Sequence, residues 1–174
     1  MGLWTDLDCG EIRTNAFQRG IAGIVASRAG AKVASRALPP LDSAVRRLSG
    51  GRSTLTEALA ALPTITLTTT GARTGRPRHT YLLAIPHQGE VAIIGSNYGQ
   101  APTPGWVHNL RAQPQVEVEH AGRSVPAVAR RLDGVEAEQV WGRARAMYAG
   151  FGLYRERASH REITVWLLVA PSAH

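Results

Sequence analysis

Arginine side chains are concentrated in residues 72–78, a short segment that follows a threonine-rich apolar run. Arg73, Arg76 and Arg78 offer planar, paired N–H donors, and the nearby Gly71 and Gly75 let the backbone approach a ligand closely. Together these residue types suit a cradle for phosphate or carboxylate groups. A solvated hairpin turn that is rich in arginine has the same sequence, and the residues alone do not separate the two interpretations.

Other familiar arrangements for catalysis or cofactor binding are absent from the sequence. It contains no Gly-x-Gly-x-x-Gly after a strand, no Walker loop, no Gly-x-Ser-x-Gly elbow and no His-Glu-x-x-His. Its six histidines do not fall at metal-ligand spacing, and no pair of carboxylates occupies a suggestive position, so no metal site is predicted. If the protein is an enzyme, a bound cofactor is expected to carry the chemistry.

Length and charge narrow the class of protein. The 174 residues suffice for one domain with a real core, and the formal charge of +7 predicts an anionic partner such as a phosphorylated cofactor, nucleic acid or an acidic membrane. Cys9 is the single cysteine, which excludes an intrachain disulfide. The acidic start lacks the apolar region of a signal peptide, and no apolar run approaches the ~20 residues that a spanning helix needs. The sequence therefore predicts a cytoplasmic protein.

The first third of the chain is predicted to be helical, with interruptions at glycine and proline. Residues 1–13 have the pattern of a poorly specified arm. Residues 15–38 form a basic amphipathic stretch, which suits either a helix on an anionic membrane or an ordinary packing helix; the second interpretation is the simpler. A short helix is predicted over 41–48, and the capping box of Thr54 and Glu57 predicts the start of another.

From residue 64 the apolar pattern changes from helical spacing to alternation, which is typical of strands. One further helix is predicted to have Thr103 as its N-cap and Pro104 as its first residue, and another to cover 135–148. The last strand is apolar on both faces and therefore central. Strands joined mostly by hairpins predict an α+β protein built on a small antiparallel barrel or sandwich. Six strands are predicted, over 64–69, 80–86, 90–95, 115–120, 124–132 and 162–170.

Three blocks of this sequence, LTTTGARTGRPR, IIGSNYGQAPTPGW and WVHNLRAQPQVEVE, resemble the signature of the deazaflavin-dependent nitroreductase family, split-barrel enzymes that use coenzyme F420. The likeness runs over residues 42–170 and includes the segments GGRSTLTEALAALP and MYAGFGLYRERA. Several blocks in the same order are more specific than any single loop. The resemblance implies a six-stranded antiparallel split β-barrel over residues 39–174, preceded by a partly helical arm over 1–38.

The resemblance also implies which residues bind the cofactor. Coenzyme F420 carries a phosphate and an acidic tail, which the basic segment would hold. The matching positions lie in the basic segment, the two strands after it and the short helix that follows: Arg73, Thr74, Arg76, Arg78, His79, Thr80, Tyr81, Leu82, Leu83, Ile94, Gly95, Ser96, Asn97, Gly105, Trp106, Val107, His108 and Asn109.

The activity implied by the resemblance is hydride transfer from the reduced cofactor to a quinone, an enone or a nitro compound. Ser96 and Tyr148 match residues that orient the acceptor or help to protonate it, which makes them the candidate catalytic pair. Substrate-pocket positions match Leu83, Tyr148, Phe151 and Tyr154.

The sequence departs from the family pattern at several of these positions. Ala72 stands where many members have a second basic residue, so the arginines would carry more of the tail binding. Leu83 and Phe151 stand where members that activate nitroimidazoles have tyrosine, which argues against activity on such drugs. Simpler roles also exist: Trp106 as a core anchor, and Tyr148 as the last apolar contact of its helix.

Three alternative functions follow from the same features. An FMN- or haem-binding relative would share the barrel without needing the basic contacts to a tail. A nucleic-acid-binding surface would interleave aromatic residues with a long basic groove, and the arginine segment has no such platform beside it, so no nucleic-acid partner is predicted. A membrane contact through residues 15–38, at the inner face of the cell membrane, is compatible with a quinone reductase.

Overall fold

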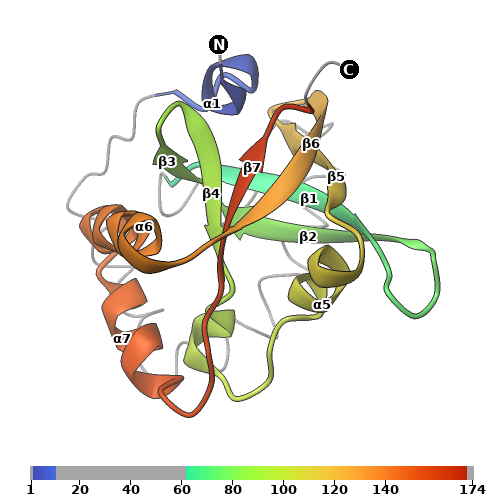
Figure 1. Ribbon diagram of the computed structural model, residues 1–174. Helices are drawn as coiled ribbons and strands as arrows, with labels where there is room; N and C mark the ends of the chain where they lie inside the picture. The colour runs from blue at the N-terminus through green and yellow to red at the C-terminus, as the bar shows by residue number, and fades with distance from the viewer. Residues whose placement is uncertain (1, 11–61, 172–174) are drawn as a thin grey trace.

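The computed structural model describes residues 2–10 and 62–171, and Figure 1 shows a curled sheet with helices at its ends and along one outer face. The helices predicted over 15–38, over 41–48 and from the capping box onward lie outside the described residues. The elements are α1 (Leu3–Asp6), β1 (Thr64–Thr70), β2 (Pro77–Leu83), β3 (Ile85–His87), β4 (Glu90–Ile94), η1 (Asn97–Gly99), α5 (Gly105–Ala112), β5 (Gln115–His120), β6 (Arg123–Leu132), α6 (Gly134–Met147), α7 (Gly150–Arg157) and β7 (Val165–Val169).

The strands form one antiparallel sheet in the order β2-β1-β5-β6-β7-β4-β3. Its two edge strands, β2 and β3, are separated along the chain by Ala84 alone, so the sheet must curl until its edges meet there. Ala84 is fully buried, and its N–H donates to the carbonyl of Pro63 at 2.8 Å. The strand predicted over 80–86 is therefore two strands, and the sheet has seven strands where the sequence predicts six. The predicted antiparallel split barrel is confirmed.

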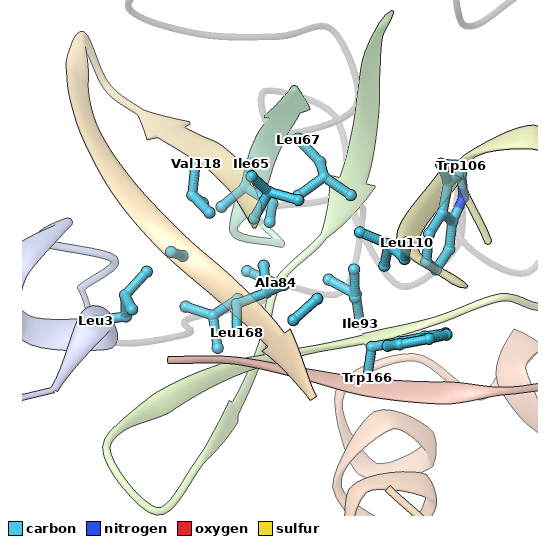
Figure 2. Packing of buried hydrophobic residues seen from close by; sticks show 14 of the residues in the cluster. Leu3, Ile65, Leu67, Ala84, Ile93, Trp106, Leu110, Val118, Trp166 and Leu168 are labelled. Carbon is cyan, nitrogen blue, oxygen red and sulfur yellow. The ribbon is translucent and has the colours of Figure 1, made fainter. Parts of the chain in front are cut away.

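The interior of the curled sheet is filled by alternate residues of its strands, as the period-2 pattern predicts. Leu67 of β1 lies opposite Val118 of β5, and both are fully buried. Complete burial of an aliphatic side chain of this size stabilises a fold by about 1.5–3 kcal/mol. Figure 2 shows this cluster, which includes Ile65, Leu67, Ala84, Ile93, Trp106, Leu110, Val118, Trp166 and Leu168.

The N-terminal residues pack against the sheet and contribute to its core. Leu3 and Leu7 are buried in the interior cluster, and the backbone N–H of Leu3 donates to Glu90 Oε2 at 2.8 Å. The N–H of Trp4 donates to the carbonyl of Gly89 at 3.0 Å. The prediction of a poorly specified arm over 1–13 is therefore wrong for residues 2–10, because a four-residue helix is too short to show a periodic pattern. The division of the chain at residues 38 and 39 stays a prediction.

A second apolar cluster lies outside the barrel, where α6 and α7 cover β3, β4 and β7 (Figure 1). Val140 and Trp141 of α6 are buried there with Phe151 of α7 and Leu167 of β7. Residues of β7 therefore face a core on each side, and β7 pairs with both β4 and β6, which confirms its predicted central position.

The two helices predicted beyond residue 100 are present with small shifts. Helix α5 begins at Gly105 with Pro104 as its N-cap residue and no side-chain cap, so the predicted N-cap at Thr103 is wrong by one position. Helix α6 ends at Met147, and Tyr148 already has extended backbone angles. Helix α7 is a further element that the apolar pattern does not predict. Within residues 2–10 and 62–171, none of the helices has the length and apolar character that crossing a membrane would require.

Candidate functional site

The basic segment is the tip of the hairpin that joins β1 to β2, and Figure 1 shows this tip projecting from the barrel. We call residues 71–78 the basic hairpin. Its turn is closed by backbone bonds between Gly71 and Arg76 at 2.9 Å and from Gly75 to Gly71 at 2.8 Å. A Cβ atom on Gly71 would lie 2.8 Å from Thr74 Oγ1 and 3.1 Å from the carbonyl oxygen of Arg76, so any other residue would force this close turn to shift. A hairpin at this position agrees with both interpretations of the sequence, the anion cradle and the solvated turn.

The three arginines of the basic hairpin, Arg73, Arg76 and Arg78, are all exposed. None of them forms an ion pair with another of the residues that the structure describes. Guanidinium groups without an acidic partner, on a hairpin whose backbone turn is tight, are available to bind phosphate or carboxylate groups.

Asn109 of α5 connects that helix to the base of the basic hairpin. Its Oδ1 accepts a hydrogen bond from the N–H of Ala72 at 3.0 Å, and its Nδ2 donates to Thr69 Oγ1 at 2.9 Å. Thr69 is almost fully buried, and its hydroxyl also donates to the carbonyl of Arg78 at 3.4 Å. The side chain that the resemblance implies for cofactor binding therefore also holds the hairpin in place.

Strand β2 presents the next group of predicted cofactor-binding residues along an edge of the sheet. His79 is exposed and its Nδ1 lies 2.9 Å from Thr68 Oγ1 on β1. Thr80, Tyr81, Leu82 and Leu83 are half-buried and pair with β1. These side chains are neither buried in the core nor freely exposed, which suits residues that line a groove.

The end of β4 carries the predicted residues Ile94, Gly95 and Ser96. A Cβ atom on Gly95 would lie 3.0 Å from Val107 Cγ2, so the missing side chain lets α5 approach the strand closely. Ser96 is 8% exposed. Through Val107 and Asn109, helix α5 thus contacts both the end of β4 and the basic hairpin.

A left-handed turn follows Ser96. Asn97, Tyr98 and Gly99 have φ angles of 49°, 55° and 77°. Residues with side chains rarely adopt this conformation, so the surroundings must stabilise it. Asn97 Nδ2 donates to the carbonyl of Pro102 at 2.9 Å, and Gly99 packs so closely on α7 that a Cβ atom would lie 3.1 Å from Tyr154 Cα.

Arg161, which the sequence did not single out, stabilises the same turn. Its guanidinium donates to the carbonyls of Ser96 at 2.7 Å, Gly95 at 3.1 Å and Gln100 at 3.1 Å. Partial burial lowers the pKa of Arg161 from its usual value. Nothing in the local sequence marks Arg161, because all three acceptors are backbone carbonyls more than 60 positions away.

Three of the four predicted substrate residues form an aromatic cluster against this turn, and the fourth, Leu83 of β2, packs against the same apolar cluster. The hydroxyls of Tyr148 and Tyr154 lie 2.9 Å apart in a buried environment, and Phe151 packs edge-to-face on both rings. Tyr98 packs edge-to-face on Tyr154 with ring centroids 5.8 Å apart. Burial raises the pKa of Tyr148, and the hydrogen bond to Tyr154 and the charge of Arg157 oppose this. The hydroxyl of Tyr148 therefore keeps its proton at neutral pH and can donate a hydrogen bond.

The structure thus brings the predicted residues together as two groups that share α5. The first group is the basic hairpin with Asn109, and the second is Ser96, the left-handed turn and the aromatic cluster. Trp106 belongs to neither group, because it is buried in the barrel interior beside Leu110 (Figure 2), as a core anchor would be. His108 is exposed. Among the described residues, no three or more His, Cys, Asp and Glu side chains are grouped where they could hold a metal ion.

Comparison with known proteins shows the family of this chain. Residues 41–170 match the family model described as F420H(2)-dependent quinone reductase. An F420H(2)-dependent quinone reductase of Mycobacterium tuberculosis is 43% identical over 58 residues, which is 33% of this chain and 39% of that protein. This chain therefore aligns with about two fifths of the length of that relative.

Two solved structures share the fold. One is an F420-H2 dependent reductase termed FDR-A, with a TM-score of 0.56 and 32% identity, covering 61% of this chain and 93% of that chain. The other is a domain-swapped dimer with a TM-score of 0.58 and 28% identity, covering 72% of this chain and 94% of that chain. Because the family model spans most of the barrel and its sequence motifs, this chain belongs to the F420H(2)-dependent quinone reductase family.

Proposed function

We propose that this protein is a reductase that uses reduced coenzyme F420 to transfer a hydride to a quinone. The observation that carries the proposal is the continuous path from the basic hairpin through α5 to Ser96 and the paired tyrosines. The path supports the proposal because it links exposed arginines, which can bind an anion, through one short helix to the strand end and turn that adjoin the hydroxyl donors. A cofactor with an acidic tail and a reactive ring needs both.

The residues fit the anionic part of the cofactor. Arg73, Arg76 and Arg78 are exposed without acidic partners among the described residues, and Gly71 permits a turn that a Cβ atom would obstruct. The ring would lie beside the half-buried edge of β2 and the end of β4, where Gly95 leaves room for close approach of Val107. Bound there, coenzyme F420 would supply the hydride.

The chain itself would orient the acceptor and exclude water. Ser96 and Tyr148 are both 8% exposed, so hydrogen bonds from their hydroxyls would form in a largely desolvated environment. Because the raised pKa of Tyr148 keeps its hydroxyl protonated, this residue would act as a hydrogen-bond donor to the acceptor oxygen. Loss of one such donor reduces turnover by about 10²–10³-fold in comparable oxyanion sites.

The departures at Leu83 and Phe151 favour a quinone over a nitroimidazole as acceptor. Phe151 is 5% exposed and packs on Tyr148 and Trp141, so it fills the cluster without adding a hydroxyl. Leu83 is half-buried at the end of β2. An apolar wall of this kind suits a planar hydrocarbon ring with few polar groups.

The first experiment is a pair of titrations of the purified protein with F420 and with FMN, followed by quenching of its four tryptophans. Saturable binding of F420 but not FMN is expected, followed by oxidation of the reduced cofactor by a menaquinone analogue. Tyr148→Phe should lower turnover and leave the Kd for F420 nearly unchanged. Binding of FMN alone, or of neither cofactor, would overturn the proposal.

We propose in addition that residues 15–38 bring the protein to anionic membranes, where quinones reside. The support is the basic amphipathic sequence, which lies outside the described residues. Deletion of the whole N-terminus is a poor test, because Leu3 and Leu7 belong to the barrel core. The better variant replaces Arg28, Lys32 and Arg36 with glutamine. This variant should lose the co-sedimentation with phosphatidylglycerol vesicles that wild-type protein shows at low salt. Equal binding of the variant and the wild-type protein to these vesicles would contradict the proposal.

A further inference from the structure

Two buried side-chain donors beside the aromatic cluster have no hydrogen-bond partner among the described residues: Arg157 Nη1 and Gln100 Nε2. Both residues lie where η1 contacts α7, because Gln100 directly follows η1 and Arg157 is the last residue of α7. A Cβ atom on Gly99, which precedes Gln100, would lie 2.9 Å from Arg157 Cβ. A buried donor without an acceptor destabilises a fold, most of all when the donor is charged, so such a pair calls for an explanation.

Arg157 lies one helical turn after Tyr154 on α7, and a Cβ atom on Gly99 would lie 2.9 Å from Arg157 Cβ and 3.1 Å from Tyr154 Cα. The charge of Arg157 lowers the pKa of both Tyr148 and Tyr154, although burial outweighs this effect and raises both values. The neighbouring Arg155, unlike Arg157, has an acidic partner: its guanidinium forms two hydrogen bonds of 2.9 and 2.6 Å with Glu138.

The geometry points to Arg157 and Gln100 as a binding site for the oxygen atom of the electron acceptor, with Arg157 holding the negative charge that develops there. This inference rests on the proposed function. Both orphaned groups are N–H donors, so their complement is an acceptor atom, and the fixed charge of Arg157 favours an anion over a neutral carbonyl. The site adjoins the aromatic cluster that carries the hydroxyl of Tyr148, which we propose orients the acceptor.

In the reaction, a hydride from the reduced cofactor forms a bond with one quinone oxygen, the ring becomes aromatic, and the π electron pair of the other carbonyl moves onto that second oxygen. The cofactor is oxidised by two electrons and the quinone is reduced by two. The resulting oxyanion accepts hydrogen bonds from Arg157 and Gln100, and it then takes a proton from water to complete the hydroquinone. Donors already positioned where charge develops stabilise the transition state without reorganisation.

The test compares Arg157→Met and Arg157→Gln with Arg155→Gln, a matched control two positions earlier on the same helix whose side chain is exposed. Equilibrium binding of 2-naphthoate and of its neutral methyl ester is measured by calorimetry on each protein loaded with oxidised F420. Wild-type protein should prefer the carboxylate. Both Arg157 variants should bind it about 10–100-fold more weakly, the effect of losing one charge-assisted hydrogen bond, and should bind the ester unchanged. The control should behave as wild type.

Thermal melting separates this role from a structural one. Removal of a guanidinium whose buried Nη1 has no partner should leave the Tm of Arg157→Met equal to that of wild type or higher. Unchanged binding of the carboxylate, or a fall in affinity for carboxylate and ester alike together with a lower Tm, would overturn the inference. If Arg157→Met does not fold, Gln100→Met is tested in its place, and it should likewise bind 2-naphthoate more weakly and the methyl ester unchanged. Failure of wild-type protein to bind F420 would instead overturn the proposed function.

Discussion

The side-chain amide of Asn109 donates to Thr69 Oγ1 at 2.9 Å, and this bond sets the position of the basic hairpin relative to α5. Thr69 is one of the last residues of β1 before the turn, and it is almost fully buried. The same amide accepts from the N–H of Ala72 inside the turn at 3.0 Å. A single side chain therefore holds the hairpin at two points.

Asn109→Ala should weaken F420 binding through loss of hairpin position. Both hydrogen bonds are lost, and the free energy of unfolding should fall by only about 1–2 kcal/mol because the site is partly exposed. The affinity for F420, measured by tryptophan quenching, should fall about tenfold. Gln113→Ala, an exposed position just after the same helix, is the control and should change neither quantity. Unaltered F420 affinity in Asn109→Ala would show that the hairpin positions itself.

The arginines of the basic hairpin should make F420 binding sensitive to salt. Each of Arg73→Ala, Arg76→Ala and Arg78→Ala should raise the Kd, and the triple variant should lose most of the salt dependence between about 0.05 and about 0.3 M ionic strength. Arg123→Ala, an exposed arginine at the start of β6, should leave that dependence intact. If the triple variant keeps the salt dependence of wild type, the anionic part of the cofactor binds elsewhere.

Arg161→Met should destabilise the protein more than loss of a surface arginine. It removes hydrogen bonds to three backbone carbonyls around the left-handed turn, at an expected loss of about 2–3 kcal/mol in the free energy of unfolding. The control is Arg131→Met, whose guanidinium pairs with Asp133 and Glu162 at the surface and should contribute about 0–1 kcal/mol. Urea unfolding of both variants checks this, and equal midpoints would count against the role of Arg161.

Glycines of α7 provide a matched pair of substitutions. A Cβ atom on Gly150 would lie 2.3 Å from Tyr148 Cζ, so Gly150→Ala must displace the tyrosine ring and should destabilise by about 1–3 kcal/mol. Two positions later, a Cβ atom on Gly152 meets only Arg145 Cδ at 3.8 Å, so Gly152→Ala should be neutral or stabilise by up to about 1 kcal/mol. Thermal melts of the two variants test the contrast, which fails if both move in the same direction.

The buried tyrosine pair should make stability fall at alkaline pH. Burial raises the pKa of Tyr154 in the folded state, so its neutral form contributes stability that is fully present below the unfolded pKa of about 10 and is lost as pH rises above it. Tyr154→Phe removes that loss, so its free energy of unfolding relative to wild type should increase between about pH 9 and about pH 11. Parallel pH profiles for the two proteins would contradict the buried, protonated state of this hydroxyl.

Much of the barrel follows from local sequence. Alternation in residues 115–120 and the turn at Ala121 and Gly122 specify a hairpin directly, because positive φ angles of 48° and 82° are adopted there by the residues that link the two strands. The apolar run of β7 predicts its place between two neighbours. The arginines and glycines of 71–78 likewise predict an exposed, tight basic hairpin from residue type, and they fit an anion cradle and a solvated turn equally well.

Only the tertiary structure decided where the strands divide and which side chains meet. Nothing near Ala84 in the sequence marks the end of one strand and the start of the next, because the break is imposed by closure of the sheet on itself. Helix α7 carries glycines and weak periodicity, and it exists because its aromatic residues pack on η1 and α6. Several contacts of the site form only when the chain folds: the pairing of Tyr148 with Tyr154, the three carbonyls bound by Arg161 and the surroundings of the Arg157 donor. Sequence patterns do not predict them, because such patterns report only the preference of each segment for its own local conformation.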